Sequence, residues 1–230
     1  MEAVIFDFNG VLWWDGNLQD KAWKAYSKKL RGWPLTDEEM AVHVHGRNSR
    51  YTLEYLLGGE VTGERLERLS EGKESVYRDL CLNQGDDFKL SPGGVELLNF
   101  LVEQQVPCTI ATASAKPNVD FFVRNLELAR WFDLKQLVYD DGQKAGKPAP
   151  DFYLQAASML GKNPGNCIVI EDSRSGIAAA KAAGAGRIVA LGPKKDQQEL
   201  GRLEGVDLVI ESLYEFPKSL IKDAVFADRR

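Results

Sequence analysis

Cysteine is scarce in this chain of 230 residues, which has three cysteines, and histidine is scarcer still, with two. Cys81, Cys108 and Cys167 are odd in number and widely spaced, which excludes a disulfide-stapled scaffold. Two of the three lie in apolar runs typical of strands. We therefore expect all three to be reduced thiols in the hydrophobic core.

Long apolar runs are missing as well. No segment is long enough to cross a bilayer, and no positively charged stretch leads into an apolar run of the kind that forms a secretory signal. We therefore expect a cytoplasmic protein with no membrane partner.

An excess of positive charge is also lacking. The 29 Lys and Arg residues are outnumbered by 34 Asp and Glu residues, which gives a formal net charge of −5. The basic residues are dispersed among acidic ones, whereas proteins that bind nucleic acid usually concentrate positive charge to contact phosphates. The sequence therefore argues against a nucleic-acid partner.

What the chain does have, at its start, is a strand pattern that ends in a carboxylate. Apolar residues from Ala3 to Phe6, rich in β-branched types, lead into Asp7 and a glycine, which predicts a buried parallel strand opening into a loop. In an open α/β sheet the carboxyl ends of the strands border the ligand crevice, so Asp7 is a candidate functional residue. The alternative for this stretch alone is that Asp7 caps the next helix.

The pattern then changes from helical to alternating. Residues 16–86 predict helices only: an amphipathic helix over 18–31, a second begun by a Thr36–Glu39 capping box and ending near 46, and two more over 51–57 and 62–82. From residue 87 onward, predicted strands and helices alternate. The sequence therefore predicts an α/β fold in which helices cover both faces of a parallel sheet, interrupted by an inserted helical unit. The predicted strands are 106–112, 137–139, 166–171, 187–191 and an edge strand at 206–210, and the predicted helices are 95–104, 117–131, 150–160 and 173–183.

Chemically capable side chains follow these strands. Asp7 ends the first strand, Thr112 the second, and Glu171 and Asp172 a later one, while Lys147 stands at the start of a helix. Because parallel strands place their carboxyl ends together, we expect these side chains to converge on one crevice. Carboxylates bind a hard cation such as Mg²⁺, lysine and hydroxyl groups stabilise phosphoryl oxygens, and an aspartate can accept a phosphoryl group. The set indicates phosphoryl transfer, although alone Thr112 and Lys147 have the ordinary alternatives of a strand-end hydroxyl and a solvated lysine.

Four motifs in order carry a resemblance to a known family: Asp7–Leu12, Thr112–Ser114, Gly146–Asp151, and Ile170–Ser173 with Gly176-Ile177 after it. Through them the sequence resembles the haloacid dehalogenase superfamily, in the subgroup of β-phosphoglucomutase and sugar-phosphate phosphatases. The resemblance covers nearly the whole chain. It implies a Rossmann-like catalytic core in residues 1–15 and 87–230, and an α-helical cap in residues 16–86 that closes over the crevice and selects substrates.

The resemblance also implies roles at the matching positions. Asp7 is implied to be the nucleophile and a Mg²⁺ ligand, and Lys147 to stabilise both the Asp7 carboxylate and the transferring phosphoryl group. The remaining metal site is implied to use Asp172 as second ligand, Glu171 to support the water shell, and the backbone carbonyl of Asn9. The implied substrate-binding set is the Thr112 hydroxyl, the backbone N–H of Ala113, Ser114 and Lys116.

Asn9 departs from the family pattern, which has a second aspartate there that protonates the leaving oxygen and then activates water. An amide exchanges no proton near neutral pH, and general acid–base help is worth roughly 10²–10⁴-fold in rate. Three explanations stay open: an engineered Asp-to-Asn variant, a natural member whose cap or leaving group reduces the need for an acid, or a loss of catalysis.

Dehalogenases and phosphonate-cleaving relatives also lack this aspartate. The Glu171–Asp172 pair argues for Mg²⁺ and against a dehalogenase, and nothing in the insert signals the Schiff-base lysine of phosphonate cleavage.

Two features of the insert bear on how the substrate is bound and on which reaction it undergoes. One hypothesis is that His45 or Arg47 contacts the substrate and that His45 supplies the missing proton; the alternative is that His43 and His45 are ordinary polar residues at a helix end. Alignment on Ala22–Lys24 places Gln19 where β-phosphoglucomutase has a base histidine, which favours a phosphatase.

The sequence thus predicts a Mg²⁺-dependent phosphatase of small phosphorylated metabolites, with sugar phosphates foremost, that acts through an aspartyl-phosphate on Asp7. The alternatives are a phosphosugar mutase of the β-phosphoglucomutase type and a catalytically weak protein that binds phosphometabolites. We expect a monomer.

Overall fold

The computed structural model of the chain describes residues 1–44 and 47–221. Contacts divide the chain into two units: a sheet unit, Met1–Trp14 with Lys89–Arg230, and a helical unit, Asp15–Phe88. The expected boundaries, after residue 15 and before residue 87, differ from these by one and two residues.

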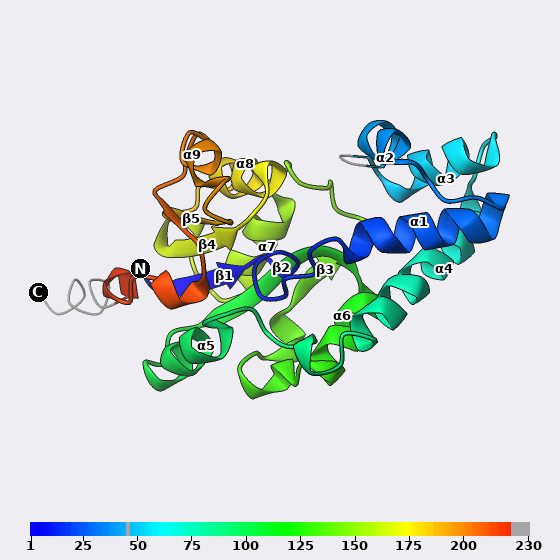
Figure 1. Cartoon of the computed structure of the whole chain (residues 1–230). Coiled ribbons are helices and arrows are strands. Elements are labelled where there is room, and N and C mark those ends of the chain that lie inside the picture. The colour runs from blue at the N-terminus through cyan, green and yellow to red at the C-terminus, as the bar shows by residue number, and fades with distance from the viewer. Residues whose placement is uncertain (45–46, 222–230) are drawn as a thin grey trace, which may run out of the picture. The chain divides into compact units, whose positions relative to one another are not determined.

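The sheet unit is built on a parallel sheet whose strands run in the order β3-β2-β1-β4-β5-β6 (Figure 1). This arrangement confirms the predicted α/β class. All four residues of β1 and all five of β4 are buried, as continuous apolar strands covered on both faces require. The strands are β1 (Ala3–Phe6), β2 (Cys108–Ala115), β3 (Val138–Asp140), β4 (Cys167–Glu171), β5 (Arg187–Leu191) and β6 (Leu208–Ile210).

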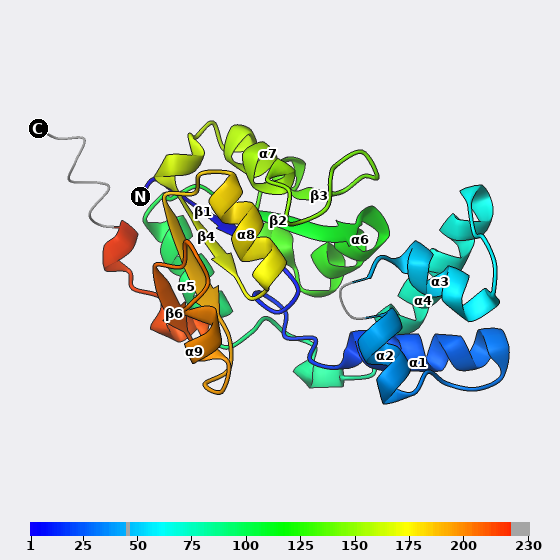
Figure 2. The same cartoon turned by 90° about the horizontal axis from the view of Figure 1, so that it is seen from above.

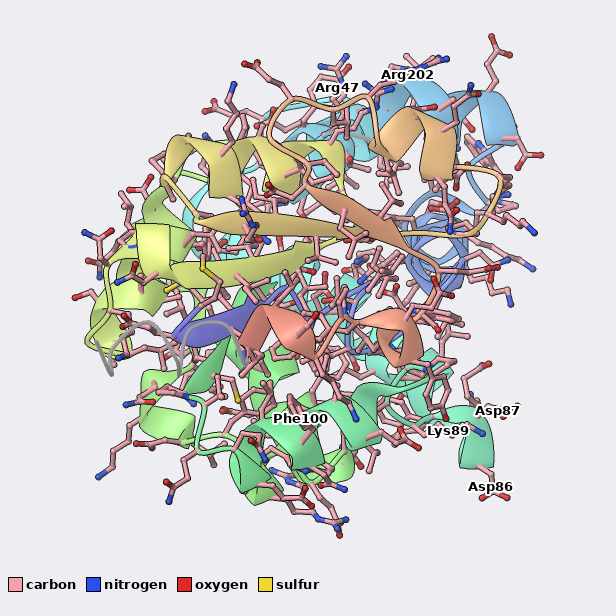
Figure 3. The ribbon with its side chains drawn as sticks, turned by 90° about the vertical axis from the view of Figure 1, so that its left-hand side faces the viewer. Arg47, Asp86, Asp87, Lys89, Phe100 and Arg202 are labelled. Carbon is pink, nitrogen blue, oxygen red and sulfur yellow. The ribbon has the colours of Figure 1, made fainter. Side chains whose placement is uncertain are left out.

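Helices cover the two faces of this sheet. The helices α7 and α8 contact each other and between them touch β1 to β5, and they share one apolar core with Ile5 and Val169. Figure 3 shows α5, which carries the labelled Phe100, on the opposite side of the sheet from the yellow α8. The helices are α5 (Gly94–Glu103), α6 (Lys116–Asn125), α7 (Asp151–Met159), α8 (Arg174–Ala182) and α9 (Gln197–Leu200), with 3-10 turns η2 (Leu128–Arg130), η3 (Leu134–Gln136), η4 (Pro164–Asn166) and η5 (Leu213–Glu215).

Several predicted positions differ from the structure, and three of them have a clear local reason. The strand β2 does not stop at Thr112, because its residue Ala115 still pairs with Asp140 of β3. The helix α6 ends at Asn125 rather than at 131, and Glu127 soon afterwards adopts a φ of 50°, which a right-handed helix excludes. Lys147 lies in the loop before α7 and not at its start, because a residue that precedes proline is disfavoured in helical conformation and Pro148 follows it.

The helical unit contains α1 (Leu18–Arg31), α2 (Asp37–His43), α3 (Ser49–Leu57), α4 (Gly63–Leu82) and the 3-10 turn η1 (Gly85–Asp87). The long helices α1 and α4 lie side by side (Figure 2). The predicted capping box is confirmed: Thr36 Oγ1 accepts from the backbone N–H of Glu39 at 3.1 Å, and Glu39 Oε2 accepts from that of Thr36 at 2.8 Å. The predicted end of the second helix near 46 lies outside the described residues.

The chain leaves and re-enters the sheet unit at hydrogen-bonded neighbours. The backbone N–H of Ser91 donates to the carbonyl of Leu12 at 2.9 Å, and the Ser91 hydroxyl donates to the carbonyl of Val11 at 2.5 Å. Both connections to residues 15–88 therefore start from one fixed point.

Cys81, Cys108 and Cys167 are free and buried, as expected. Within residues 1–44 and 47–221, no helix is both long and apolar enough to span a bilayer.

Candidate active site

Asp7 lies at the point where the order of the strands reverses. The chain adds β2 and β3 on one side of β1 and β4 to β6 on the other. Open α/β sheets bind ligands at such a switch point, outside the carboxyl ends of the strands. The register places Phe6 beside Ile110 of β2 and Ile170 of β4, so the next residue, Asp7, emerges level with both neighbours. The backbone N–H of Asp7 donates to Ile170 O at 3.0 Å and fixes the start of the loop.

The Lys147 ammonium joins Asp7 to Glu171. Its Nζ donates to Asp7 Oδ1 at 2.5 Å and to Glu171 Oε1 at 2.6 Å. It also contacts the Tyr153 hydroxyl at 3.0 Å and the Ala111 carbonyl at 3.3 Å. The side chains of Lys147, Asp7 and Glu171 are 8, 10 and 1% exposed, so this charge cluster is shielded from water. The structure thus brings together the three groups that the sequence placed in separate motifs.

Both carboxylate oxygens of Glu171 are engaged by donors from the protein. Besides Lys147, the Tyr153 hydroxyl donates to Oε1 at 2.7 Å. The backbone N–H groups of Asp172 and Ser173 donate to Oε2 at 2.9 Å each, and the Ser173 hydroxyl donates at 3.0 Å. Glu171 was expected to support the metal's water shell; here it holds Lys147 and the loop that carries Asp172.

Two buried carboxyl groups at this site, those of Asp7 and Asp172, have raised pKa values. Burial raises the pKa of Asp7 to about 7 although Lys147 acts in the opposite direction. Burial also raises the pKa of Asp172 to about 8, with further contributions from the charges of Glu171 and Asp7. Burial would raise the pKa of Glu171 too, but the charge and hydrogen bond of Lys147, together with the hydrogen bonds from Ser173 and Tyr153, lower that pKa. Lys147 therefore contacts the carboxylates of both Asp7 and Glu171, but the pKa is lowered only at Glu171, which has further hydrogen-bond donors.

These features fit a divalent cation bound by oxygen. Asp7 and Asp172 lie close enough for their charges to interact, and a cation between them would relieve the repulsion that raises the pKa of Asp172. Gly10 has a φ of +85°, and a Cβ there would lie 2.0 Å from Asp172 Oδ2, so only glycine lets the loop approach this carboxylate. Among the described residues no three His, Cys, Asp or Glu side chains form a metal cluster. Two carboxylates with backbone oxygen and water match Mg²⁺, which keeps several waters.

A second polar cluster links β2 to the Asp7 loop. The backbone N–H of Ser114 donates to Thr112 Oγ1 at 3.1 Å, and the Ser114 hydroxyl donates to Asn9 Oδ1 at 2.9 Å. Thr112 is buried, whereas Ala113 beside it is exposed. The strand therefore brings Thr112, Ser114 and Asn9 to one place.

Within the sheet unit, one expected substrate-binding residue, Lys116, has a different partner. Lys116 on α6 is exposed, and its ammonium pairs with Asp120 at 2.6 Å rather than with the cluster around Asp7. Arg47 belongs to the helical unit, where its guanidinium lies 4.9 Å from the Tyr51 ring and its Nε donates to the Val42 carbonyl at 3.4 Å. Figure 3 labels Arg47. His45 falls outside the described residues.

Tyr153 is the site residue that sequence reasoning missed. It lies in the first turn of α7, fully buried, and its hydroxyl contacts both Lys147 and Glu171. The available signal was weak: a tyrosine, rather than a phenylalanine, at an apolar-face position three residues after the Pro150 of the lysine motif. A buried tyrosine usually has a hydrogen-bond partner for its hydroxyl, and here the partners are the catalytic candidates.

Comparison with known proteins places the chain among relatives. A family profile described as haloacid dehalogenase-like hydrolase matches residues 1–184. The chain is 33% identical over 192 residues to the phosphorylated carbohydrates phosphatase of Thermotoga maritima, covering 82% of this chain and 84% of that protein. It is 31% identical over 224 residues to the beta-phosphoglucomutase of Bacillus subtilis, covering 94% and 95%. A solved structure, a HAD hydrolase of family IA, variant 3, from Entamoeba histolytica, matches with a TM-score of 0.89 at 36% identity, covering 98% of this chain and 100% of that one.

Proposed function

Because the chain belongs to the haloacid dehalogenase-like hydrolase family, as its motifs indicated, we propose that it hydrolyses small phosphorylated metabolites, sugar phosphates foremost, through an aspartyl-phosphate on Asp7. The observation that carries this proposal is the Lys147 ammonium, which holds Asp7 at 2.5 Å and Glu171 at 2.6 Å at the strand-order switch. A buried cation beside a carboxylate both orients the nucleophile and stabilises phosphoryl oxygens.

Different residues around Asp7 position the Lys147 ammonium and the phosphoryl group. Glu171 and Tyr153 hold the Lys147 ammonium, so its distance to Asp7 is fixed before substrate arrives. The Thr112 hydroxyl, on the neighbouring strand, is proposed to hydrogen-bond the transferring phosphoryl group. Groups that are fixed beforehand need no reorganisation when charge develops in the transition state.

The proposed cofactor is Mg²⁺, held by the carboxylates of Asp7 and Asp172 and the backbone carbonyl of Asn9. Support comes from the raised pKa values of the two aspartates and from the close approach of Gly10 to Asp172. When bound, the cation supplies charge neutralisation for the phosphate.

Residues 15–88 are proposed to act as the cap, the part that selects the substrate and excludes water during reaction. The unit has its own core, formed by residues such as Trp23, Leu35 and Leu53, and can therefore move as one body. We propose that the protein acts as a monomer.

The test is phosphate release from a panel of phosphorylated sugars and other metabolites with and without Mg²⁺. We expect turnover that requires the metal and disappears in Asp7→Ala, while the surface variant Asp133→Ala keeps it. A beryllium fluoride adduct on Asp7 should form in the original chain. Turnover persisting in Asp7→Ala would overturn the nucleophile assignment.

A mutase is the second candidate, favoured by 31% identity to the beta-phosphoglucomutase of Bacillus subtilis over nearly the full length of both chains. Conversion of β-glucose 1-phosphate without net phosphate release would establish it. Adduct formation without turnover of any substrate would instead identify a binding protein.

A further inference from the structure

The amide of Asn9 is fixed in the second polar cluster, which links β2 to the loop after Asp7. The Ser114 hydroxyl donates to Asn9 Oδ1 at 2.9 Å, and the backbone N–H of Ser114 donates to Thr112 Oγ1 at 3.1 Å. Asn9 follows Asp7 by two residues, and Thr112 lies on β2, the strand paired with β1. The protein thus holds the Asn9 amide in place, and an amide has no proton to give up near neutral pH.

The described groups in this cluster do not supply a proton to a departing oxygen near neutral pH. The Asn9 amide and the hydroxyls of Ser114 and Thr112 keep their protons in this range. The Lys147 ammonium is committed to Asp7 and Glu171. Asp172, the carboxyl group proposed to hold the cation, is ionised when the cation is bound and then has no proton to give. An N–H group can stabilise a departing oxyanion by hydrogen bonding, but that oxyanion leaves unprotonated.

We propose, on the basis of the function proposed above, that the protein selects phosphorylated substrates whose leaving oxygen is stable as an anion: anomeric, acyl or aryl phosphates rather than phosphates of ordinary alcohols. A sugar 1-phosphate releases a hemiacetal oxygen, which is more acidic than the primary hydroxyl released from a 6-phosphate. Among sugar phosphates, the preference is therefore for the anomeric position.

The reaction balances without an acid in the first step. An oxygen of the Asp7 carboxylate forms a bond to phosphorus while the bond from phosphorus to the leaving oxygen breaks. The electron pair stays on the leaving oxygen, which takes a proton from solvent after it departs. Water then attacks phosphorus, the bond from phosphorus to Asp7 breaks with its electron pair returning to the carboxylate, and one water proton passes to solvent.

The test uses substituted phenyl phosphates, because they vary the basicity of the leaving oxygen at nearly constant size and so separate it from recognition of the sugar. The kcat/KM of each is measured with Mg²⁺ for the original chain and for Asn9→Asp. In the original chain, kcat/KM should fall steeply as the phenol becomes more basic. In Asn9→Asp the fall should be shallower. The ratio of kcat/KM in Asn9→Asp to kcat/KM in the original chain should therefore grow by about 10²–10⁴-fold from the best to the poorest leaving group.

Sugar phosphates provide the second arm. Glucose 1-phosphate and glucose 6-phosphate carry the same sugar, and the original chain should prefer the 1-phosphate by a larger factor than Asn9→Asp does. Equal slopes in the two proteins, or a shallow slope in the original chain, would overturn the inference, because either result reveals a proton donor elsewhere in the chain.

Ser114→Ala tests the positioning role of the hydroxyl. Loss of one hydrogen bond should lower kcat/KM about two- to tenfold across the whole phenyl series, with the slope unchanged, and Ser114→Thr should restore most of it. A slope that changes in Ser114→Ala would overturn the inference, since Ser114 would then take part in proton transfer.

Failure of the proposed function is distinguishable from failure of this inference. A burst of phenol equal to the enzyme concentration, absent in Asp7→Ala, establishes the aspartyl-phosphate independently of any slope. Equal slopes together with a burst overturn the leaving-group selectivity alone. No burst, no turnover and no beryllium fluoride adduct in either protein would overturn both.

Discussion

Tyr153 positions charged residues although its own hydroxyl does not titrate in the working range. Burial raises its pKa well above the ordinary value, and the charge of Glu171 adds to the effect. The hydroxyl therefore stays protonated and donates to Glu171, while Lys147 donates to its oxygen. A lysine with several fixed partners has less freedom to leave Asp7.

Tyr153→Phe should lower activity while leaving the fold intact. The ring stays, but a hydrogen bond to the charged Glu171 is lost, and such bonds contribute about 1.5–3 kcal/mol. We expect kcat to fall about ten- to hundredfold, with a pH profile of unchanged shape because the hydroxyl does not titrate. Steady-state kinetics across pH are the measurement, and Tyr214→Phe, at an exposed tyrosine, is the control. Activity within twofold of the original would show that Lys147 is held without Tyr153.

The residue scale also shows where sequence reasoning stops. Motif order anticipated that Asp7, Lys147 and Glu171 would meet, because strand ends and their loops share one edge of a parallel sheet. It did not anticipate that Lys116 would pair with Asp120, or that protein donors would engage both oxygens of Glu171. Spacing along the chain gives the position of a residue but not the direction of its side chain. The chemical roles of these residues stay predictions.

At the scale of elements, the first turn of α8 is pressed against the active-site cluster. A Cβ on Gly176 would lie 1.6 Å from Glu171 Oε1. Ser173 caps the helix by accepting from the backbone N–H of Gly176 at 3.0 Å, which holds the turn at this distance. The helix can therefore begin beside Glu171 only if position 176 has no side chain.

Gly176→Ala should be destabilising even though alanine is the better helix former. Propensity alone would favour alanine by about 1 kcal/mol, but overpacking a buried site costs about 1–3 kcal/mol and here displaces Glu171. We expect a lower free energy of unfolding in urea, together with reduced kcat/KM. Ser175→Ala, at the exposed neighbouring position of the same turn, is the matched control and should stay within about 0.5 kcal/mol. Equal stability of the two variants would contradict the close approach.

The elements themselves were largely predictable, because hydrophobic period and length separate buried strands from amphipathic helices. Each of the six strands overlaps a predicted one, and α1 and β5 have the predicted bounds. The errors fall where tertiary contacts decide, as where Ala115 extends β2 through its pairing with Asp140. The placement of Lys147 at the start of a helix was wrong for a local reason, because Pro148 follows it and a residue before proline is disfavoured in helical conformation.

At the scale of the whole molecule, the two aspartates link stability to pH and to the metal. The pKa of Asp7 rises from 3.8 to about 7 and that of Asp172 from 3.8 to about 8 on folding. The folded state therefore binds more protons than the unfolded state between about pH 4 and pH 8, and stability falls as the pH rises through this window. A cation that binds the two ionised carboxylates should reverse the loss.

We expect the melting temperature without Mg²⁺ to be lower at pH 8 than at pH 5, and Mg²⁺ to raise it more at pH 8. A metal at a hundred times its dissociation constant stabilises by about 2.7 kcal/mol. Thermal unfolding with and without Mg²⁺ is the measurement, and Asp172→Asn, which cannot ionise, should show a smaller dependence on both. An equal effect of Mg²⁺ at the two pH values would contradict the assignment.

The hydrogen bonds from Ser91 to Leu12 and Val11 have a consequence for how such a protein diversifies. Because the chain leaves and re-enters the sheet unit at backbone groups that are hydrogen-bonded to each other, the sheet unit can form whatever segment lies between them. Evolution can exchange, lengthen or shorten the inserted segment while Asp7 and Lys147 keep their spacing. If that segment acts as the proposed cap, such changes alter the range of substrates. One sheet unit is then compatible with many inserted segments. A different segment grafted in the laboratory between the same two points should leave the sheet unit folded.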